Sequence, residues 1–215
     1  MKKGLRWKIA QFLEVRWWRN YLSEKDKTSY YSWKKEYWYS FLSKHSITIP
    51  RNQRILDAGC GPAGIFTVLQ DHQVVAMDPL LDYYQAQLPL FEPTDWPWVT
   101  FHKSSLEDFQ VESPFNLVFC LNAINHVADL GKSLNVLSEV CASNGTLYLS
   151  VDVHRWRFFR WLFGLVPVDI LHPHQYTRSE YVKRMEAAGF QISQVRTIKE
   201  EFFFNYILII ANKSA

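Results

Sequence analysis

One short run limits the possible folds of this chain more than any other, namely Arg54-Ile-Leu-Asp-Ala-Gly-Cys-Gly-Pro-Ala-Gly-Ile-Phe66. It begins with apolar residues that are typical of a short buried strand, and it ends in residues that can start a helix. Gly59, Gly61 and Gly64 stand at the turn between the two. Glycine suits this turn because the chain must bend sharply and its backbone must approach a ligand closely. The run therefore predicts a strand, a ligand-binding loop and a helix.

Two classes of ligand fit this glycine pattern. The G-x-G-x-x-G spacing alone fits a loop that holds the pyrophosphate of a dinucleotide. Asp57, however, stands two residues before the first glycine. A carboxylate at the end of a buried strand is costly without a partner, and it repels phosphate but suits a ligand that carries positive charge. Asp57 therefore favours a cationic ligand, and the alternative is that it only caps the following turn.

Composition narrows the class of protein. With 215 residues the chain can form one domain with a substantial core, and its net charge of +3 is too small to indicate nucleic-acid binding. Cys60, Cys120 and Cys141 show no metal or disulfide spacing, which favours a reducing compartment. No apolar run reaches the roughly 18 residues of a spanning helix, and charges interrupt the N-terminal apolar stretch. We expect a cytoplasmic protein without a metal site.

The N-terminal part predicts two helices, at residues 5–22 and 29–45. In the second, aromatic residues recur at helical spacing and form one broad face. They are Tyr30, Trp33, Tyr37, Trp38 and Phe41. The lysines of this segment, Lys34, Lys35 and Lys44, are expected largely off that face. We predict a helical cap or lid at residues 1–49 and a main domain at residues 50–215.

From Pro50 onward, predicted strands and helices alternate. The strands are residues 55–58, 73–77, 99–103, 115–121, 146–153, 190–198 and 202–211. The helices are residues 64–71, 80–88, a segment from Leu130 that Asn144-Gly145 ends, and a segment from the capping box Thr177-Arg-Ser-Glu180 to Gly189. Alternation predicts an α/β fold, namely a Rossmann-like, doubly wound, mostly parallel seven-stranded sheet. The last two strands are too close for a crossover helix, so they must form an antiparallel hairpin.

Ligands bind such sheets at the carboxyl ends of the strands. Three markers fall there: the glycine loop, Asp78, and the run Leu121-Asn-Ala-Ile-Asn-His-Val127. This set resembles the class I S-adenosylmethionine-dependent methyltransferases over roughly residues 52–212. Its most specific part is Asp57-Ala-Gly-Cys-Gly-Pro-Ala-Gly64 followed by Asp78. The resemblance implies S-adenosylmethionine as the cofactor.

The resemblance also implies roles for the matching positions. Asp57 would lie near the methionine portion and its ammonium group. Ala58, Gly59 and Gly61 would let the backbone lie against the methionine and the ribose. Asp78 would accept hydrogen bonds from both ribose hydroxyls.

Four further positions complete the implied cofactor site. Pro79 would flank the adenine, Leu106 would lie beneath its other face, and Asn122 would offer its backbone carbonyl near the methionine portion. Family members often carry an aspartate that binds the adenine amine after the third strand. Ser105 stands at that position here, so the resemblance leaves the adenine contact open.

The implied reaction is direct in-line transfer of a methyl group to an acceptor. His126 and His154 follow the fourth and fifth strands and are candidates to deprotonate an oxygen acceptor, with a structural role as the alternative. The chain has no Asn-Pro-Pro-Tyr run after the fourth strand, and by the same resemblance this disfavours the enzymes that methylate amino groups of nucleic acids. It also has no basic cluster, which disfavours nucleic acid as well. Its aromatic content of 16% favours a small apolar or aromatic acceptor. The rivals are a nicotinamide-dependent oxidoreductase and a non-catalytic binding module.

Residues 154–176 are an acceptor-side insertion rich in arginine, tryptophan and phenylalanine. Three interpretations fit this composition: a lid or wall over the acceptor, a plain packed insertion, and a helix on a membrane surface. The lid is favoured and the membrane contact is not. His172 and His174 lie in this insertion, and the oligomeric state is not predicted.

Overall fold

The computed structural model describes residues 5–154, 176–201 and 204–214. The α-helices are α1 (Leu5–Leu22), α2 (Lys27–Lys44), α3 (Leu81–Gln87), α4 (Leu130–Val140) and α6 (Arg178–Ala187). The strands are β1 (Arg54–Ala58), β2 (Gln73–Met77), β3 (Val99–His102), β4 (Phe115–Leu121), β5 (Cys141–His154), β6 (Phe190–Glu200) and β7 (Phe204–Lys213). The first two helices and all seven predicted strands are therefore present, with small differences at their ends.

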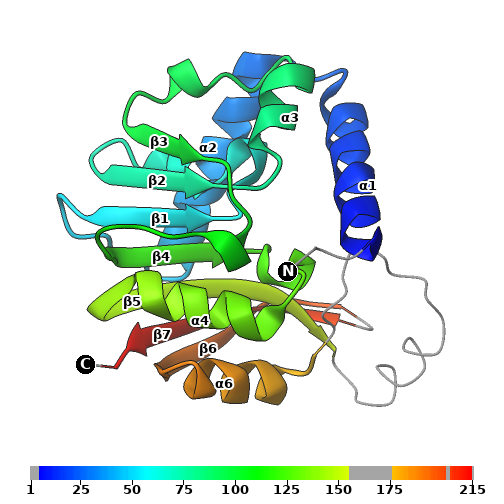
Figure 1. Cartoon of the computed structure of the whole chain (residues 1–215). Helices are drawn as coiled ribbons and strands as arrows, with labels where there is room; N and C mark the ends of the chain where they lie inside the picture. Colours follow the sequence, from blue (N-terminus) through cyan, green and yellow to red (C-terminus); the bar gives the residue numbers. More distant parts are fainter. Residues whose placement is uncertain (1–4, 155–175, 202–203, 215) are drawn as a thin grey trace.

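The strands form one sheet in the order β3-β2-β1-β4-β5-β7-β6 (Figure 1). Strands β1 to β5 run parallel, whereas β7 runs antiparallel to both β5 and β6. The predicted α/β architecture and its closing hairpin are confirmed. The parallel strands end at the same edge, so the loops after β1, β2, β3 and β4 are brought together there.

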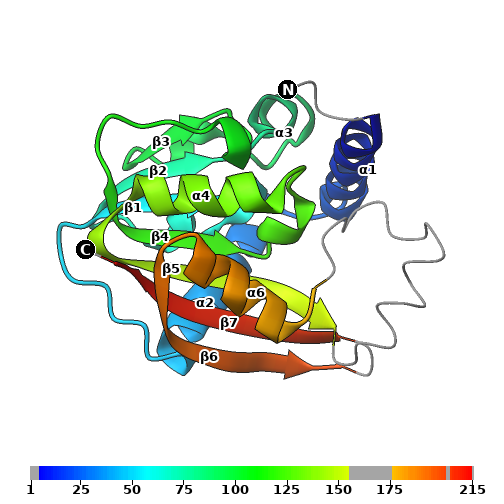
Figure 2. The same cartoon turned by 60° about the horizontal axis from the view of Figure 1, so that its bottom comes forward.

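Helices cover both faces of the sheet. Alternate strand residues point to opposite faces, and Ile55 and Phe119 pack in the cluster that contains α2 and α3. Leu56 and Val118 pack in the other cluster, against α4 and α6 (Figure 2). The hydrophobic side chains of the central strands are thus buried on both sides, as a doubly wound sheet requires.

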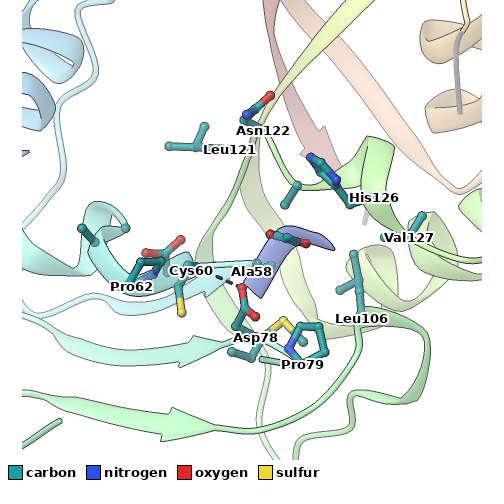
Figure 3. A pocket seen from close by; sticks show the side chains of 18 of the residues that line it. Ala58, Cys60, Pro62, Asp78, Pro79, Leu106, Leu121, Asn122, His126 and Val127 are labelled. Carbon is teal, nitrogen blue, oxygen red and sulfur yellow. Dashed lines mark hydrogen bonds between the residues drawn. The ribbon is translucent and has the colours of Figure 1, made fainter. Parts of the chain in front are cut away.

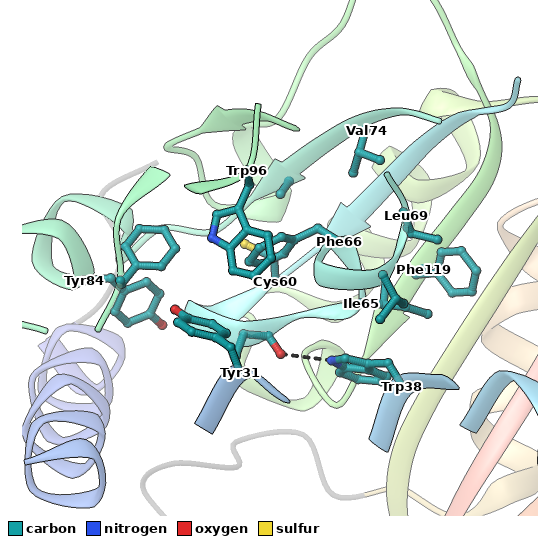
Figure 4. Packing of buried hydrophobic residues seen from close by; sticks show 14 of the residues in the cluster. Tyr31, Trp38, Cys60, Ile65, Phe66, Leu69, Val74, Tyr84, Trp96 and Phe119 are labelled. Atoms are coloured by element: carbon teal, nitrogen blue, oxygen red, sulfur yellow. Dashed lines mark hydrogen bonds between the residues drawn. The ribbon is translucent and has the colours of Figure 1, made fainter. Parts of the chain in front are cut away.

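The predicted helix at residues 64–71 is wrong. Two short 3-10 turns, Gly61–Ala63 and Ile65–Val68, stand there instead. Gly64 between them is extended, with ψ of −175°, so no continuous helix can form. Helix α2 covers this part of the sheet: the Trp38 indole N–H donates to the Ala63 carbonyl at 3.0 Å, and the Tyr31 hydroxyl donates to the Pro62 carbonyl at 3.0 Å (Figure 4).

The predicted end of α4 at Asn144-Gly145 is also wrong. The helix ends at Val140, and β5 begins at the next residue. Asn144 is left-handed, with φ of 62°. It lies where Cys141 pairs with Phe115 and Thr146 pairs with Leu117, so β5 carries extra residues there. The Asn-Gly pair therefore forms a bulge in a strand, a position that also needs left-handed backbone.

Candidate active site

A cavity of about 740 Å³ lies at the carboxyl ends of the parallel strands. Its floor is made by the loops after β1, β2, β3 and β4, and side chains from α1 and α2 line it as well (Figure 3). All nine residues predicted to hold the cofactor line it, together with His126. The nine are Asp57, Ala58, Gly59, Gly61, Asp78, Pro79, Ser105, Leu106 and Asn122. The topology therefore brings the sequence-predicted residues into one site, while their individual roles stay predictions.

The glycine loop presents bare backbone to this cavity. Gly59 has a φ of +72°, and a Cβ atom there would lie 2.3 Å from the Ala123 Cβ. The N–H groups of Gly59 and Cys60 donate to the Met77 carbonyl at 2.8 and 3.1 Å. These bonds fix the loop against the end of β2, and no side chain fits at Gly59. The loop is thus a cradle that a ligand can approach closely.

Asp57 combines the two roles that its position in the sequence allows. Its carboxylate accepts a hydrogen bond from the Phe66 N–H at 3.0 Å, so it caps the turn after the glycine loop. It also lines the cavity and is almost fully buried. Burial, with a smaller contribution from the nearby Asp78, raises its pKa to about 7 against the lowering effect of the Phe66 N–H. A bound cation beside it would favour the charged form.

Asp78, which follows β2, holds the loop after β1 and the loop after β2 together. One carboxylate oxygen accepts the Leu80 N–H at 2.8 Å, and the other accepts the Gly61 N–H at 3.0 Å. Burial raises its pKa to about 6, while these backbone N–H groups lower it. A carboxylate has about four acceptor sites, so two backbone bonds leave room for ligand hydroxyls. The side chain is therefore fixed in place and can still accept bonds from a ribose.

Glu14 of α1 is a site residue that the sequence reasoning missed. It lines the cavity, and burial raises its pKa to about 8, with a further contribution from Asp78. Trp18 lies one helical turn farther on and lines the cavity beside it. One signal could have found Glu14: it is the one acidic residue among the first 22 of the chain. A single acidic residue in an otherwise basic helix indicates that its side chain faces a binding site rather than solvent.

Lys34 of α2 is a second missed residue, and its predicted place off the aromatic face is wrong. Tyr31 and Trp38 lie three residues before and four after it, and both donate to carbonyls of the glycine loop. Lys34 therefore shares the face that is docked on this loop, and it lines the cavity. Its ammonium lies 5.3 to 5.8 Å from three aromatic rings.

The Lys34 ammonium is suited to an anionic ligand group. Burial lowers its pKa. No carboxylate of the described residues forms an ion pair with it. Aromatic faces attract a cation but do not neutralise its charge. The cavity thus combines carboxylates at the ends of β1 and β2 with an uncompensated cation near the glycine loop.

The side of the cavity that is predicted to hold the adenine has a polar residue, Ser105, next to an apolar one, Leu106. The Ser105 hydroxyl donates to the Asp108 carboxylate at 2.9 Å, and Leu106 is buried next to it. Glu107 accepts the N–H groups of Ala128 and Asp129 at 2.6 and 3.1 Å, which ties the loops after β3 and β4 together. The loop that carries Ser105 and Leu106 is thus held in place by side-chain bonds.

The opposite side of the cavity lies after β4 and β5. Asn122 is left-handed, with φ of 54°, and its N–H donates to the Ser150 carbonyl at 3.0 Å. The Ser150 hydroxyl lies 2.6 Å from the Tyr206 hydroxyl. His126 lines the cavity from the loop after β4 (Figure 3). This side therefore contributes a histidine and a phenol beside the backbone of Asn122.

Three of the predicted features are not fully described by the structure. His154 is the last residue of β5 and pairs with Phe204 in the sheet, but its side chain is not among those described. His172 and His174 lie in residues 155–175, which are likewise not described. The lid at 154–176 and the second catalytic histidine therefore stay predictions.

A family model described as a methyltransferase domain matches residues 30–195, which is more than half of the chain. The chain therefore belongs to this family, and its fold is that of the class I S-adenosylmethionine-dependent methyltransferases. The match includes α2 as well as the sheet. The nicotinamide-dependent alternative is not favoured by this result.

Particular relatives add detail to this assignment. A ubiquinone biosynthesis O-methyltransferase from Nitrobacter winogradskyi is 26% identical over 155 residues, which are 66% of this chain and 58% of the relative. The match thus spans somewhat more than half of that relative's length. A solved structure from Bacillus halodurans, a candidate methyltransferase, superposes with a TM-score of 0.69 and 17% identity, over 82% of this chain and all of the other.

A second solved structure contains ligands. The 1,6-didemethyltoxoflavin-N1-methyltransferase of Burkholderia thailandensis was solved with 1,6-didemethyltoxoflavin and S-adenosylhomocysteine. It superposes with a TM-score of 0.61 and 17% identity, over 95% of this chain and 90% of the other. At this identity the likeness concerns the fold alone.

Proposed function

We propose that this protein transfers a methyl group from S-adenosylmethionine to a small acceptor with an apolar or aromatic body. The observation that carries the proposal is the cavity, which joins the glycine cradle and Asp78 on one side to His126 and Tyr206 on the other. When bound, S-adenosylmethionine supplies a methyl group on a sulfonium centre that is already activated for in-line displacement. The chain's own task is then to bind, to align and to exclude water.

The cradle fits the donor at three places. Asp78 accepts the ribose hydroxyls, because its oxygens are fixed by backbone bonds and retain acceptor capacity. Gly59 and Gly61 allow the methionine portion and the ribose to lie against bare backbone. Pro79 and Leu106 provide apolar contacts for the adenine ring beside Ser105.

The charged groups fit the amino acid end of the donor. Asp57 and the backbone at Asn122 lie on the side of the ammonium group. Lys34 binds the carboxylate, because it is the cation next to the glycine loop and its burial leaves it with few water contacts. A charge-assisted bond of this kind is worth about 1.5–3 kcal/mol.

Rings line the acceptor side. Tyr37, Trp38 and Tyr206 line the cavity, as do Leu121 and Val127, and flat apolar walls of this kind hold a ring-shaped or apolar molecule. The names of two relatives, an O-methyltransferase and an N1-methyltransferase, support methyl transfer to oxygen or to nitrogen. With an oxygen acceptor, His126 takes the proton. Alignment of the two reactants contributes about 7–11 kcal/mol in favourable cases.

Calorimetric titration tests the donor assignment. The wild type is expected to bind S-adenosylhomocysteine and not NAD, and Lys34→Met should weaken that affinity by about tenfold or more. Binding of 5′-methylthioadenosine, which lacks the amino acid end, should not change. Lys35→Met is the matched control, because Lys35 lies over Trp96 and outside the cavity. Binding of NAD alone would support the oxidoreductase instead.

Turnover tests the reaction itself. Labelled S-adenosylmethionine is incubated with a panel of phenols and heteroaromatic amines, and methylated product is measured. His126→Gln should slow transfer to a phenol by about a hundredfold and leave transfer to a neutral amine nearly unchanged. Tight S-adenosylhomocysteine binding with no product from any acceptor would support the non-catalytic binding module.

A further inference from the structure

Helix α1 has a second face that points away from the cavity. It lies at the edge of the molecule, beyond the carboxyl ends of the strands (Figures 1 and 2). Its inner face contributes Gln11, Glu14 and Trp18 to the cavity. On the outer side, Phe12 is 65% exposed and Leu13 is 37% exposed. Neither lines the cavity, so the donor site does not explain these exposed apolar side chains.

A row of ring contacts, which passes through the buried Tyr30, links α1 to α2. The Trp17 ring stacks on Tyr21 at 4.9 Å, and Tyr21 lies 6.4 Å from Tyr30. Trp33 follows at 6.1 Å from Tyr30, and Tyr37 lies 6.3 Å from Trp33. We call the exposed members of this surface the aromatic face; they are Phe12, Leu13, Trp17, Tyr21, Trp33 and Tyr37.

The aromatic face borders the opening of the cavity. Trp17 is 52% exposed and Tyr37 is 40% exposed, and both also line the cavity. A surface that was merely a packing remnant would have no reason to end at the mouth of the site. Contiguous exposed apolar surface of this kind marks a place of interaction.

Positive charges prevail on α1, although the acidic residues Glu24 and Asp26 follow it in the connection to α2, and Glu36 is exposed on α2. Arg16 and Arg19 are exposed on α1, and the Lys25 ammonium lies 4.6 Å from the Tyr21 ring. The one acid of α1, Glu14, lines the cavity. Trp and Tyr are enriched where proteins meet the membrane–water interface, and arginine is attracted to anionic head groups. A second copy of the chain would bring the same cations together, which disfavours a symmetric dimer through this face.

We propose that the aromatic face docks on an anionic lipid surface, with α1 lying in the interface. Arg16 and Arg19 would contact lipid phosphates, while Phe12, Leu13 and Trp17 enter the boundary between head groups and acyl chains. The cavity would then open at the membrane, where an apolar acceptor is concentrated. None of the helices in the described ranges is long and apolar enough to cross a bilayer.

Vesicle sedimentation with the full chain tests the docking. The wild type should sediment with phosphatidylcholine vesicles that contain about 30% phosphatidylglycerol, and much less with pure phosphatidylcholine or in about 0.5 M salt. Phe12→Ser with Leu13→Ser should reduce binding by about tenfold or more. The matched control is Tyr39→Ser, because Tyr39 is 50% exposed on α2 and has no part in the row of rings.

A second pair of variants tests the charges. Arg16→Gln with Arg19→Gln should weaken binding to anionic vesicles, whereas Arg51→Gln with Lys183→Gln removes the same charge elsewhere and should not. The affinity of every variant for S-adenosylhomocysteine should match the wild type, since none of these residues lines the cavity. This readout separates failure of docking from failure of the donor site.

Two outcomes would overturn the proposal. The first is a wild type that stays in solution with anionic vesicles, or binding that the Phe12 and Leu13 substitutions leave unchanged. The second is a concentration-dependent dimer, seen by light scattering, that these substitutions abolish; the aromatic face would then bind a second copy of the chain.

Discussion

Asp78 has two tasks at the residue scale, and they can be separated. Its oxygens hold the N–H groups of Gly61 and Leu80, and the same carboxylate faces the cavity. Replacing it therefore changes both the loop and the ligand contacts. The two tasks can be compared with two substitutions. Asp78→Ala removes both oxygens, whereas Asp78→Asn keeps one oxygen but loses the charge.

Asp78→Ala is expected to weaken S-adenosylhomocysteine binding by about tenfold or more without unfolding the protein. Asp78→Asn should lose less thermal stability, because its amide oxygen still accepts one N–H, but it should also bind the ligand weakly. Calorimetry and thermal melting measure the two effects. Asp82→Ala, at an exposed ion pair with Lys103, is the control. Unchanged affinity in Asp78→Ala would contradict the ribose assignment.

Glu14 predicts a pH dependence of stability. Its pKa is raised from 4.5 to about 8 in the folded protein, so the folded state holds this proton more firmly than the unfolded state. Its contribution is complete below about pH 4.5 and is lost as the pH rises through about 8. Glu14→Gln cannot ionise, so its melting temperature without ligand should fall less than that of the wild type between about pH 5 and pH 9. Parallel curves would show that Glu14 is not buried in this way.

The sequence pointed to the residues that line the cavity from the sheet, but not to those that line it from the N-terminal helices. Asp57, Gly59 and Asp78 follow strands, and a parallel sheet places all its strand ends at one edge. Glu14 and Lys34 stand before the first strand. The spacing of these residues does not predict that α1 and α2 lie at the carboxyl ends of the strands. The position of each helix depends on which of its faces packs against the core.

At the scale of the element, α2 replaces a missing helix. Two 3-10 turns follow β1, so the face of the sheet beside them would be exposed without another cover. Trp38 provides part of that cover and donates its indole N–H to the Ala63 carbonyl. The glycine loop is thus held by a helix that is distant in sequence, which links the packing of α2 to the shape of the cavity.

Trp38→Phe keeps an aromatic ring but leaves the Ala63 carbonyl without this donor. We expect a loss of about 1–3 kcal/mol in the free energy of unfolding, the usual effect of removing one partner of a buried bond. Trp33→Phe on the same helix, which is 49% exposed, should change it by less than about 0.5 kcal/mol. Urea denaturation measures both variants, and equal losses would count against the docking of α2 through Trp38.

At the scale of the whole molecule, α1 is the element most separable from the sheet. It buries Val15 and Leu22 in the core that includes α2, while Glu14 and Trp18 line the cavity. A chain that starts at Asp26 keeps the N-cap of α2, whose carboxylate accepts the Ser29 N–H at 2.8 Å. The domain should therefore fold without α1 but hold its ligand less well.

Removal of residues 1–25 is expected to preserve cooperative unfolding at a lower temperature and to weaken S-adenosylhomocysteine binding by about tenfold or more. Vesicle binding should also be lost. Circular dichroism, calorimetry and sedimentation check these three results. If the shortened chain binds the ligand as tightly as the full chain, α1 is not part of the donor site.

The sequence by itself determined the seven strands, the closing hairpin and the strand-end residues that line the cavity. These follow from local patterns: apolar periodicity, glycine at left-handed turns, and carboxylates at strand ends. The tertiary structure decided which segment covers β1, where α4 ends, and that Glu14 and Lys34 line the site. The reason is that hydrophobic burial is not directional, so the sequence of an apolar face does not say which other element it will pack against. That partner is fixed only when the whole core packs.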